Sequence, residues 1–138
     1  ELSGERMFVA VDSDGGIGGL GQEDEHSCFS DNTNRDVFAN AKGVYNVIFG
    51  EYGSINGVSF YDLVVEADAV QGQKLLDAGN IAMAKATIVG NNSQPFDLLI
   101  TQESVGNGQI GPIIESARAL EDWANEISAS ASAIGINL

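Results

Sequence analysis

The chain has 138 residues, a formal net charge of −14 at pH 7 and a hydrophobic fraction of 43%. One domain over residues 1–138 with a real core is expected, because domains usually span about 100–200 residues. Only 6 Lys and Arg accompany 20 Asp and Glu, and no two basic residues are neighbours. This distribution argues against nucleic acids and anionic membranes as partners, because binding to phosphates needs clustered positive charge.

Export is indicated only indirectly. No apolar run approaches the ~20 residues of a membrane span, and the sequence starts at Glu1 without an initiator methionine. We therefore expect a mature chain whose leader has been removed, at an extracellular or cell-surface location and without membrane insertion. Cys28 is the only cysteine, so the chain has no internal disulfide framework and depends on its core.

The N-terminal part of the chain predicts a strand followed by a long loop. Residues 6–11 are rich in β-branched and aromatic side chains, which favours a strand. Residues 12–36 are rich in Gly and Asp and predict a loop. Loops longer than about 12–15 residues are usually functional or mobile, so a functional site is expected here first.

The middle of the chain predicts further strands. Residues 36–41 predict one or two helical turns, and residues 43–49 predict a second strand. The Asn56-Gly57 pair is a strong hairpin signal. Residues 58–70 alternate between apolar and acidic side chains over much of their length, which predicts a third strand with one apolar face.

Two more strands are predicted after a turn. Residues 74–79 are compatible with a helical turn or with a short edge segment. Residues 81–89 predict a fourth strand with small side chains on one face. Residues 96–101 predict a fifth strand, and the turn-forming residues 91–95 would let the fourth and fifth strands pair.

The C-terminal part predicts a helix over residues 112–128. Pro112 suits the first position of a helix, and apolar residues then recur at spacings of three and four. These residues are Ile113, Ala117, Leu120, Ala124 and Ile127. Residues 128–133 alternate Ser and Ala, and either extend this helix or form a strand. Together the elements predict an α+β fold: an antiparallel β-sheet of about five strands, or a β-sandwich, covered by one C-terminal amphipathic helix.

The Gly-rich loop contains a pattern typical of dinucleotide binding. Residues 16–21 match G-x-G-x-x-G and follow a predicted strand. Glu23, Asp24 and Glu25 come directly afterwards, where their charges would repel a pyrophosphate. The chain is also too short for the alternating strands and helices of that fold. A flexible connection is therefore the preferred interpretation.

The same loop can be aligned with an EF-hand calcium loop. Asp12 and Asp14 fall at loop positions 1 and 3, and Glu23 falls at position 12. Ile17 falls at position 6, where Gly makes the sharp turn, so a regular EF-hand is disfavoured. A less regular Ca²⁺ site stays open, because hard cations bind clustered oxygens. Its predicted ligands are Asp12, Asp14, Glu23, Asp24 and Asp31, and no other cofactor is expected.

The residues needed for catalysis are scarce. His26 is the only histidine, so any Ser-His-Asp or Cys-His site must include it. Cys28 lies two residues away and is interpreted as a packed or incidental thiol, because side chains so spaced point in different directions in regular structure. No spacing selects a pair of carboxylates for glycosidase-type chemistry. We therefore name no catalytic or cofactor-binding residue and favour a non-enzymatic protein.

Three functions remain compatible with the sequence. The leading one is an exported or surface domain that acts through protein–protein contacts, as a self-assembling homo-oligomeric subunit of a filament, coat or surface layer. The first alternative is a small ligand-binding protein or a carboxylate-dependent enzyme, with its site near the 12–36 loop and His26 at the mouth of its pocket. The second alternative is an acidic protein of the inhibitor or immunity type.

Overall fold

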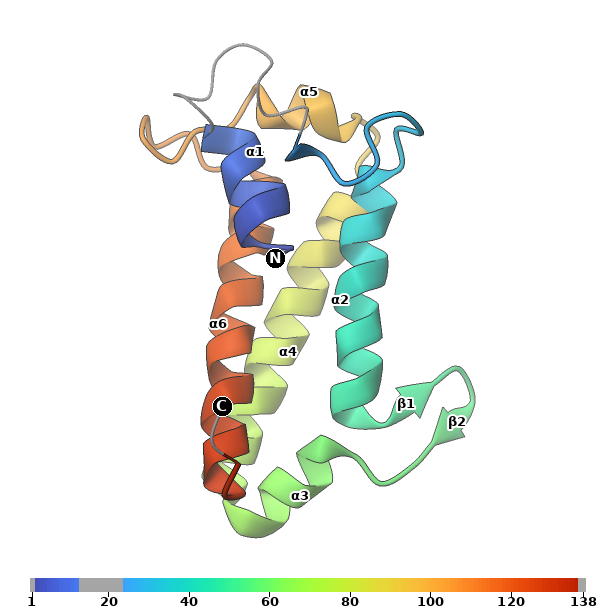
Figure 1. The fold of residues 1–138 in the computed structure, drawn as a ribbon, viewed down its shortest axis with the longest axis vertical. Coiled ribbons are helices and arrows are strands. Elements are labelled where there is room, and N and C mark those ends of the chain that lie inside the picture. Colours follow the sequence, from blue (N-terminus) through green and yellow to red (C-terminus); the bar gives the residue numbers. More distant parts are fainter. Residues whose placement is uncertain (1, 13–23, 137–138) are drawn as a thin grey trace.

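Three long helices dominate the computed structural model, which describes residues 2–12 and 24–136 (Figure 1). They are α2 (Thr33–Phe49), α4 (Ala69–Gly90) and α6 (Pro112–Ala133). The shorter elements are the π-helical turn η1 (Gly4–Phe8), α1 (Val9–Asp12), α3 (Phe60–Ala67), α5 (Phe96–Ile100), β1 (Glu51–Tyr52) and β2 (Ile55–Asn56). The protein is mostly helical, with 67% helix.

The predicted five-stranded sheet is therefore wrong, and so is the sandwich alternative. All five predicted strands lie wholly or mainly in helices: residues 43–49 in α2, residues 58–70 mainly in α3 and the start of α4, residues 81–89 in α4, and residues 96–101 mainly in α5. Residues 6–11, the remaining one, lie in η1 and α1.

The strands in the described residues form one two-stranded antiparallel hairpin. Glu51 pairs with Asn56 and Tyr52 pairs with Ile55. The turn between them contains Gly53, whose φ of +62° lies in the left-handed region that glycine adopts without strain. The hairpin therefore turns before the Asn56-Gly57 pair from which it was predicted.

Helix α4 lies between the other two long helices and packs on both α6 and α2. Figure 1 shows α5 across the upper end of the three helices and α3 across their lower end, with η1 and α1 beside the upper part of α6. An upper core gathers around Met7, Val37, Phe96 and Ile113. A lower core gathers around Trp123, and it includes buried residues of α2, α3 and α4.

The sequence pattern of α4 explains why it was mistaken for a strand. Its buried positions include Leu75, Gly79, Ala82, Ala86 and Val89, which follow the helical spacing of four and three. Three of these five are Gly or Ala, and such small side chains do not mark a helix face by their hydrophobicity. The large residues Ile81 and Ile88 are instead 55% and 52% exposed. The helical period of the buried face is therefore formed largely by small residues. These residues let α2 and α6 each pack closely against α4.

Close packing at Gly90 leads to a stability prediction. A Cβ added at Gly90 would lie 2.6 Å from the Cβ of Phe38 on α2, while one added at Gly43 would meet nothing within 4 Å. Replacing Gly90 by alanine should lower the free energy of unfolding by about 1–3 kcal/mol, because the helices must move apart. Replacing Gly43 should raise it by about 0.5–1 kcal/mol, because alanine loses less backbone entropy in a helix. Urea denaturation of both variants checks this, and equal shifts would contradict the packing.

Helix α6 begins at Pro112, as the sequence predicts, and continues through the Ser and Ala residues to Ala133. Part of the predicted 12–36 loop, residues 13–23, lies outside the described residues, and its end at 33–36 belongs to α2. That residues 1–138 form a single domain stays a prediction.

Candidate functional site

A short connection before α2 is fastened to the first turn of that helix. The backbone N–H of Ser27 donates to the Oγ1 of Thr33, at 3.0 Å. Thr33 is the first residue of α2 and is fully buried. Asp31 has a φ of 51°, a left-handed conformation that Asp tolerates better than most residues. These features bring His26 to the side of the first turn of α2.

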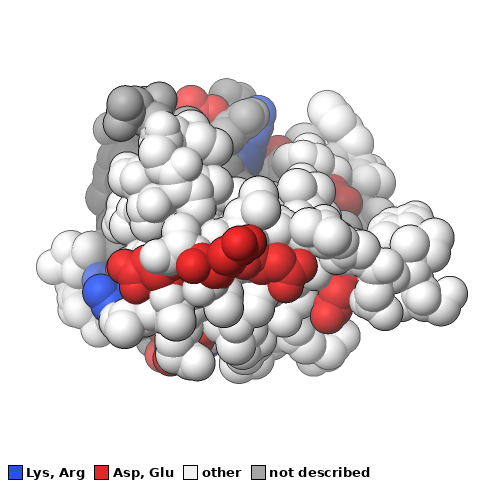
Figure 2. Space-filling view, turned by 90° about the horizontal axis from the view of Figure 1, so that it is seen from below, with Lys and Arg blue, Asp and Glu red and all other residues white. Residues whose placement is uncertain are grey.

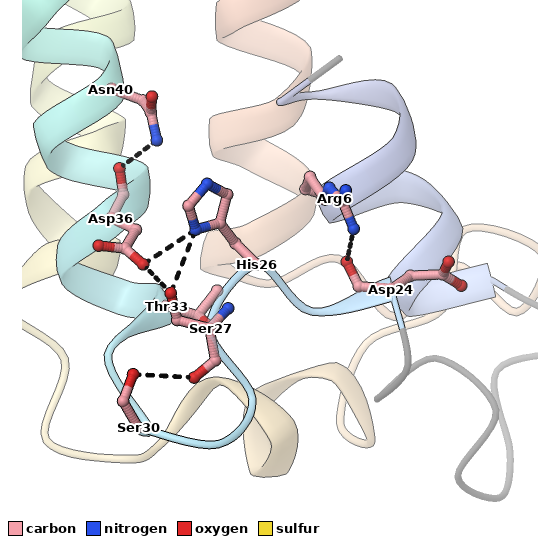
Figure 3. A network of polar contacts seen from close by, with 8 residues as sticks. All are labelled: Arg6, Asp24, His26, Ser27, Ser30, Thr33, Asp36 and Asn40. Atoms are coloured by element: carbon pink, nitrogen blue, oxygen red, sulfur yellow. Dashed lines mark hydrogen bonds and ion pairs between the residues drawn. The ribbon is translucent and has the colours of Figure 1, made fainter.

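There the imidazole of His26 contacts the carboxylate of Asp36. His26 Nδ1 lies 3.0 Å from Asp36 Oδ2, and the hydroxyl of Ser27 donates to the same oxygen. A carboxylate accepts hydrogen bonds, so in the neutral ring this contact places the N–H on Nδ1 and leaves the lone pair on Nε2. In Figure 3 the second ring nitrogen points away from Asp36, and the side chain is 42% exposed. This contact orients the imidazole, and Nε2 has no hydrogen-bond partner among the described residues.

Arg6 lies near His26, on η1. Its Nη1 donates to the backbone oxygen of Asp24 at 3.3 Å, which ties η1 to the connection that carries His26 (Figure 3). Its Nε is buried and has no hydrogen-bond partner in the part of the chain that the structure describes. A buried N–H without an acceptor is unusual in folded proteins. Arg6 therefore has donor capacity that no described residue uses.

His26 and Arg6 both line a pocket of about 470 Å³ between η1, α2 and α6. The remaining lining residues are uncharged: Leu2, Ser3, Asn40, Ala41, Val44, Leu120, Trp123, Ala124 and Ile127. No Asp or Glu is among them, although the chain has 20. The pocket is thus an apolar groove with its basic groups contributed by η1 and the connection before α2.

Glu25, beside His26 in sequence, is buried and does not line the pocket. Burial raises the pKa of its carboxyl above the usual value, and the carboxylates of Asp97 and Asp31 raise the pKa further. A hydrogen bond with the Thr33 side chain acts in the opposite direction. Because the pKa is raised, Glu25 contributes stability at low pH that is lost as the pH rises through its folded pKa.

The predicted calcium ligands are described only in part. Asp14 and Glu23 lie outside the described residues, and Asp12 is described only as the last residue of α1. Asp24 uses its backbone oxygen to accept from Arg6, and Asp31 is exposed. Within residues 2–12 and 24–136, no group of three His, Cys, Asp or Glu side chains could hold a metal ion. The calcium site at Asp12, Asp14, Glu23, Asp24 and Asp31 stays a prediction.

Sequence reasoning singled out His26 but missed its partners. Asp36 was considered only as the start of one or two helical turns, and Arg6 was assigned to a strand. The signal available for Asp36 was its place in the first turn of a helix that follows the only histidine. No sequence signal connected Arg6 to this site, because a long stretch of chain separates it from His26.

The fold and the pocket define a helical domain with a groove that is open to solvent on one side. The chain belongs to the Imelysin family: a family model described as Imelysin, peptidase M75, matches residues 1–111. No curated protein matches the chain. The matched range ends directly before α6, which forms one wall of the pocket.

The Imelysin family is iron-related, and its members are typically secreted or periplasmic. This supports the expected export in general terms. Among the described helices, none combines the length and the apolar character needed to span a bilayer.

Proposed function

We propose that this chain is an iron-related binding domain that takes its iron as an anionic chelate, in the pocket between η1, α2 and α6. The observation that carries this proposal is the His26–Asp36 pair, which leaves Nε2 of His26 as a free nitrogen donor at the pocket. The proposal develops the ligand-binding alternative, with the pocket between helices.

The charges around the pocket argue against a bare iron ion as the ligand. A bare cation is best held by several oxygen and nitrogen donors, and the described residues contain no group of three such side chains. They therefore do not form a resident iron centre by themselves. Arg6 would also repel a cation. A chelate with a net negative charge brings its own donors and is attracted by Arg6.

Apart from Asp36, a group of acidic residues lies away from the pocket. Figure 2 shows Asp and Glu side chains in a row across the lower end. Helix α3, at that end, carries Asp62 and Glu66, both of them exposed. A negatively charged ligand is therefore expected to be repelled at the lower end, and it meets positive charge at Arg6.

The arrangement of His26 suits a ligand donor. Histidines that bind metals usually donate their other ring N–H to a carboxylate, which fixes the ring and raises its basicity. Asp36 is placed to do this from Nδ1. Nε2 of His26 would then fill one open coordination position of the chelated iron, while the chelate supplies the others.

The family description contains the word peptidase, and His26, Ser27 and Asp36 are the residue types of a serine-peptidase triad. In such a triad the imidazole stands between Ser and Asp and uses a different nitrogen for each. Here the Ser27 hydroxyl donates directly to Asp36, and it is Nδ1 of His26 that lies 3.0 Å from Asp36 and 3.2 Å from Ser27 Oγ. We therefore do not assign Ser27 as a nucleophile.

Anaerobic titration with ferrous nitrilotriacetate tests the proposed function. Wild-type protein should bind the chelate, and replacing His26 by glutamine should abolish measurable binding. Replacing Asp36 by asparagine should weaken binding by about 10–100-fold, because a carboxylate that orients a metal-binding histidine has an effect of this size. Arg35→Gln, on the exposed surface of α2, is the charge control and should bind normally. Equal binding by wild type and His26→Gln would contradict the proposal.

Self-assembly into a filament, coat or surface layer stays a prediction, as does an inhibitor or immunity-type role. The described surface does expose apolar side chains at the hairpin, with Tyr52 at 73% and Ile55 at 67%. Nothing in the described residues supplies a partner for them. The pocket therefore supports ligand binding better than this surface supports assembly.

A further inference from the structure

Most of the pocket wall is apolar, except at its basic end, which is formed by Arg6 and His26. Leu120 and Ile127 of α6 are partly buried, and Val44 of α2 is 46% exposed. Exposed branched side chains in a groove are stabilised when a ligand removes them from water. The wall thus favours a ligand with an apolar body.

The basic end favours a ligand with an anionic head. Arg6 has a buried Nε without a partner in the described chain, and one Nη donates to Asp24. A guanidinium binds carboxylates through charge-assisted hydrogen bonds, and Arg6 itself lines the pocket. Among the described residues, no Asp or Glu lines the pocket to compete for Arg6. The sole imidazole of the chain stands at the same pocket.

We infer that the pocket binds a free amphipathic organic acid, with its carboxylate on Arg6 and its apolar chain along Val44, Leu120 and Ile127. This inference rests on the proposed function because it assigns the organic part of the ligand to the same pocket. A volume of about 470 Å³ lies within the range of small-molecule sites. The carboxylate gives orientation and the apolar wall gives affinity.

Decanoate is the probe, and Trp123 is the reporter, because it is the only tryptophan and lines the pocket. Decanoate should change Trp123 fluorescence in a saturable way. Decanol, without the charge, and acetate, without the chain, should each bind at least about tenfold more weakly. Equal binding of decanol and decanoate would overturn the role of the carboxylate.

Five variants complete the test. Arg6→Gln and Ile127→Asn should each weaken decanoate binding by about tenfold or more, and Arg6→Lys should weaken it less than Arg6→Gln. The matched controls Arg35→Gln and Ile88→Asn, both exposed outside the pocket, should stay within about twofold of wild type. Thermal melting confirms that each variant is folded. If a folded Arg6→Gln variant binds decanoate as tightly as wild type, the inference is overturned.

Two further outcomes separate the alternatives. Decanoate carries no metal, so binding of decanoate without binding of the iron chelate would overturn the proposed function alone. Binding of the iron chelate without binding of decanoate would overturn this inference alone. Sedimentation with phosphatidylglycerol vesicles should show no binding. Binding to such vesicles without binding of free decanoate would overturn the assignment of a free acid.

Discussion

Replacing Glu103 by alanine is expected to lower the free energy of unfolding by about 3–5 kcal/mol. Glu103 is 3% exposed, and its two carboxylate oxygens accept the backbone N–H groups of Ile113, at 2.9 Å, and Ile114, at 2.8 Å. These N–H groups belong to the first turn of α6, where a helix has no partners of its own for them. Alanine would leave both unpaired and would open a cavity.

The chain brings Glu103 to this position by a tight turn. Ser104 and Gln109 exchange two backbone hydrogen bonds of 2.8 Å, and Gly108 in the turn has a φ of +71°. Gly111 must lack a side chain, because a Cβ there would lie 2.6 Å from the Glu103 carboxyl carbon. The side chain therefore fills a space shaped for it, and the loss in the alanine variant should not be relieved by local rearrangement.

Glu103→Gln is the matched control for charge. It keeps the shape but replaces one accepting oxygen by an NH₂ group, so one backbone N–H loses its acceptor, at a cost of about 1–3 kcal/mol. In urea denaturation, the free energy of unfolding should therefore be highest for the wild type, lower for Glu103→Gln and lowest for Glu103→Ala. A loss below about 1 kcal/mol in the alanine variant would contradict the capping role.

The same residue predicts a pH dependence. Burial raises the pKa of the Glu103 carboxyl above its ordinary value of 4.5, and the hydrogen bonds from Ile113, Ile114 and Gly111 only partly oppose this. A carboxyl with a raised folded pKa stabilises the protein fully below the unfolded pKa, and this stability is lost as the pH rises through the folded pKa. As the pH rises from the unfolded pKa through the folded pKa of Glu103, the free energy of unfolding should fall more in the wild type than in Glu103→Gln.

Replacing Trp123 by alanine is expected to cost a similar amount, about 3–5 kcal/mol. Trp123 is 2% exposed in the lower core, and its ring centroid lies 6.1 Å from that of Tyr45. Its indole Nε1 lies against Gly79 of α4, where an added Cβ would be only 3.1 Å away. Removing the ring would leave a large cavity between α2, α4 and α6.

Trp123→Phe separates ring packing from the indole N–H. That N–H is buried without a partner in the described residues, so its removal relieves a desolvation cost and the phenylalanine variant should lose only about 1–2 kcal/mol. Guanidinium unfolding followed by circular dichroism measures both losses. Equal losses in the two variants would contradict a role for the ring in the packing of the lower core.

The sequence predicted α6 from Pro112 at its start and from apolar residues at helical spacing, of which Ile113 and Ala117 are buried whereas Ala124 is exposed. The same reasoning failed for α4, where the buried face is formed largely by Gly and Ala and two large apolar residues are exposed. In α3, Val64 is buried while Leu63 and Val65 are exposed, so tertiary packing and not alternation decided the structure. The contacts that select helix here lie between elements distant in sequence.

Of the residues of the candidate site, only His26 could be predicted from the sequence. His26 stood out as the only imidazole, and the segment before α2 was expected to carry function. Arg6 and the wall formed by α6 reach His26 only through the tertiary fold, and no sequence pattern links them. Glu103 was missed because its hydrogen-bond partners are backbone N–H groups, which every residue except proline carries and no sequence pattern indicates.

The most direct test of the central claim, that His26 contacts the ligand through Nε2, is ¹⁵N NMR of the protein labelled at histidine. Because His26 is the only histidine, the spectrum contains a single pair of ring nitrogens. On addition of ferrous nitrilotriacetate, the Nε2 signal should broaden strongly, while the proton on Nδ1 should stay hydrogen-bonded to the Asp36 carboxylate. Ring signals that remain unchanged while the chelate binds would contradict the claim.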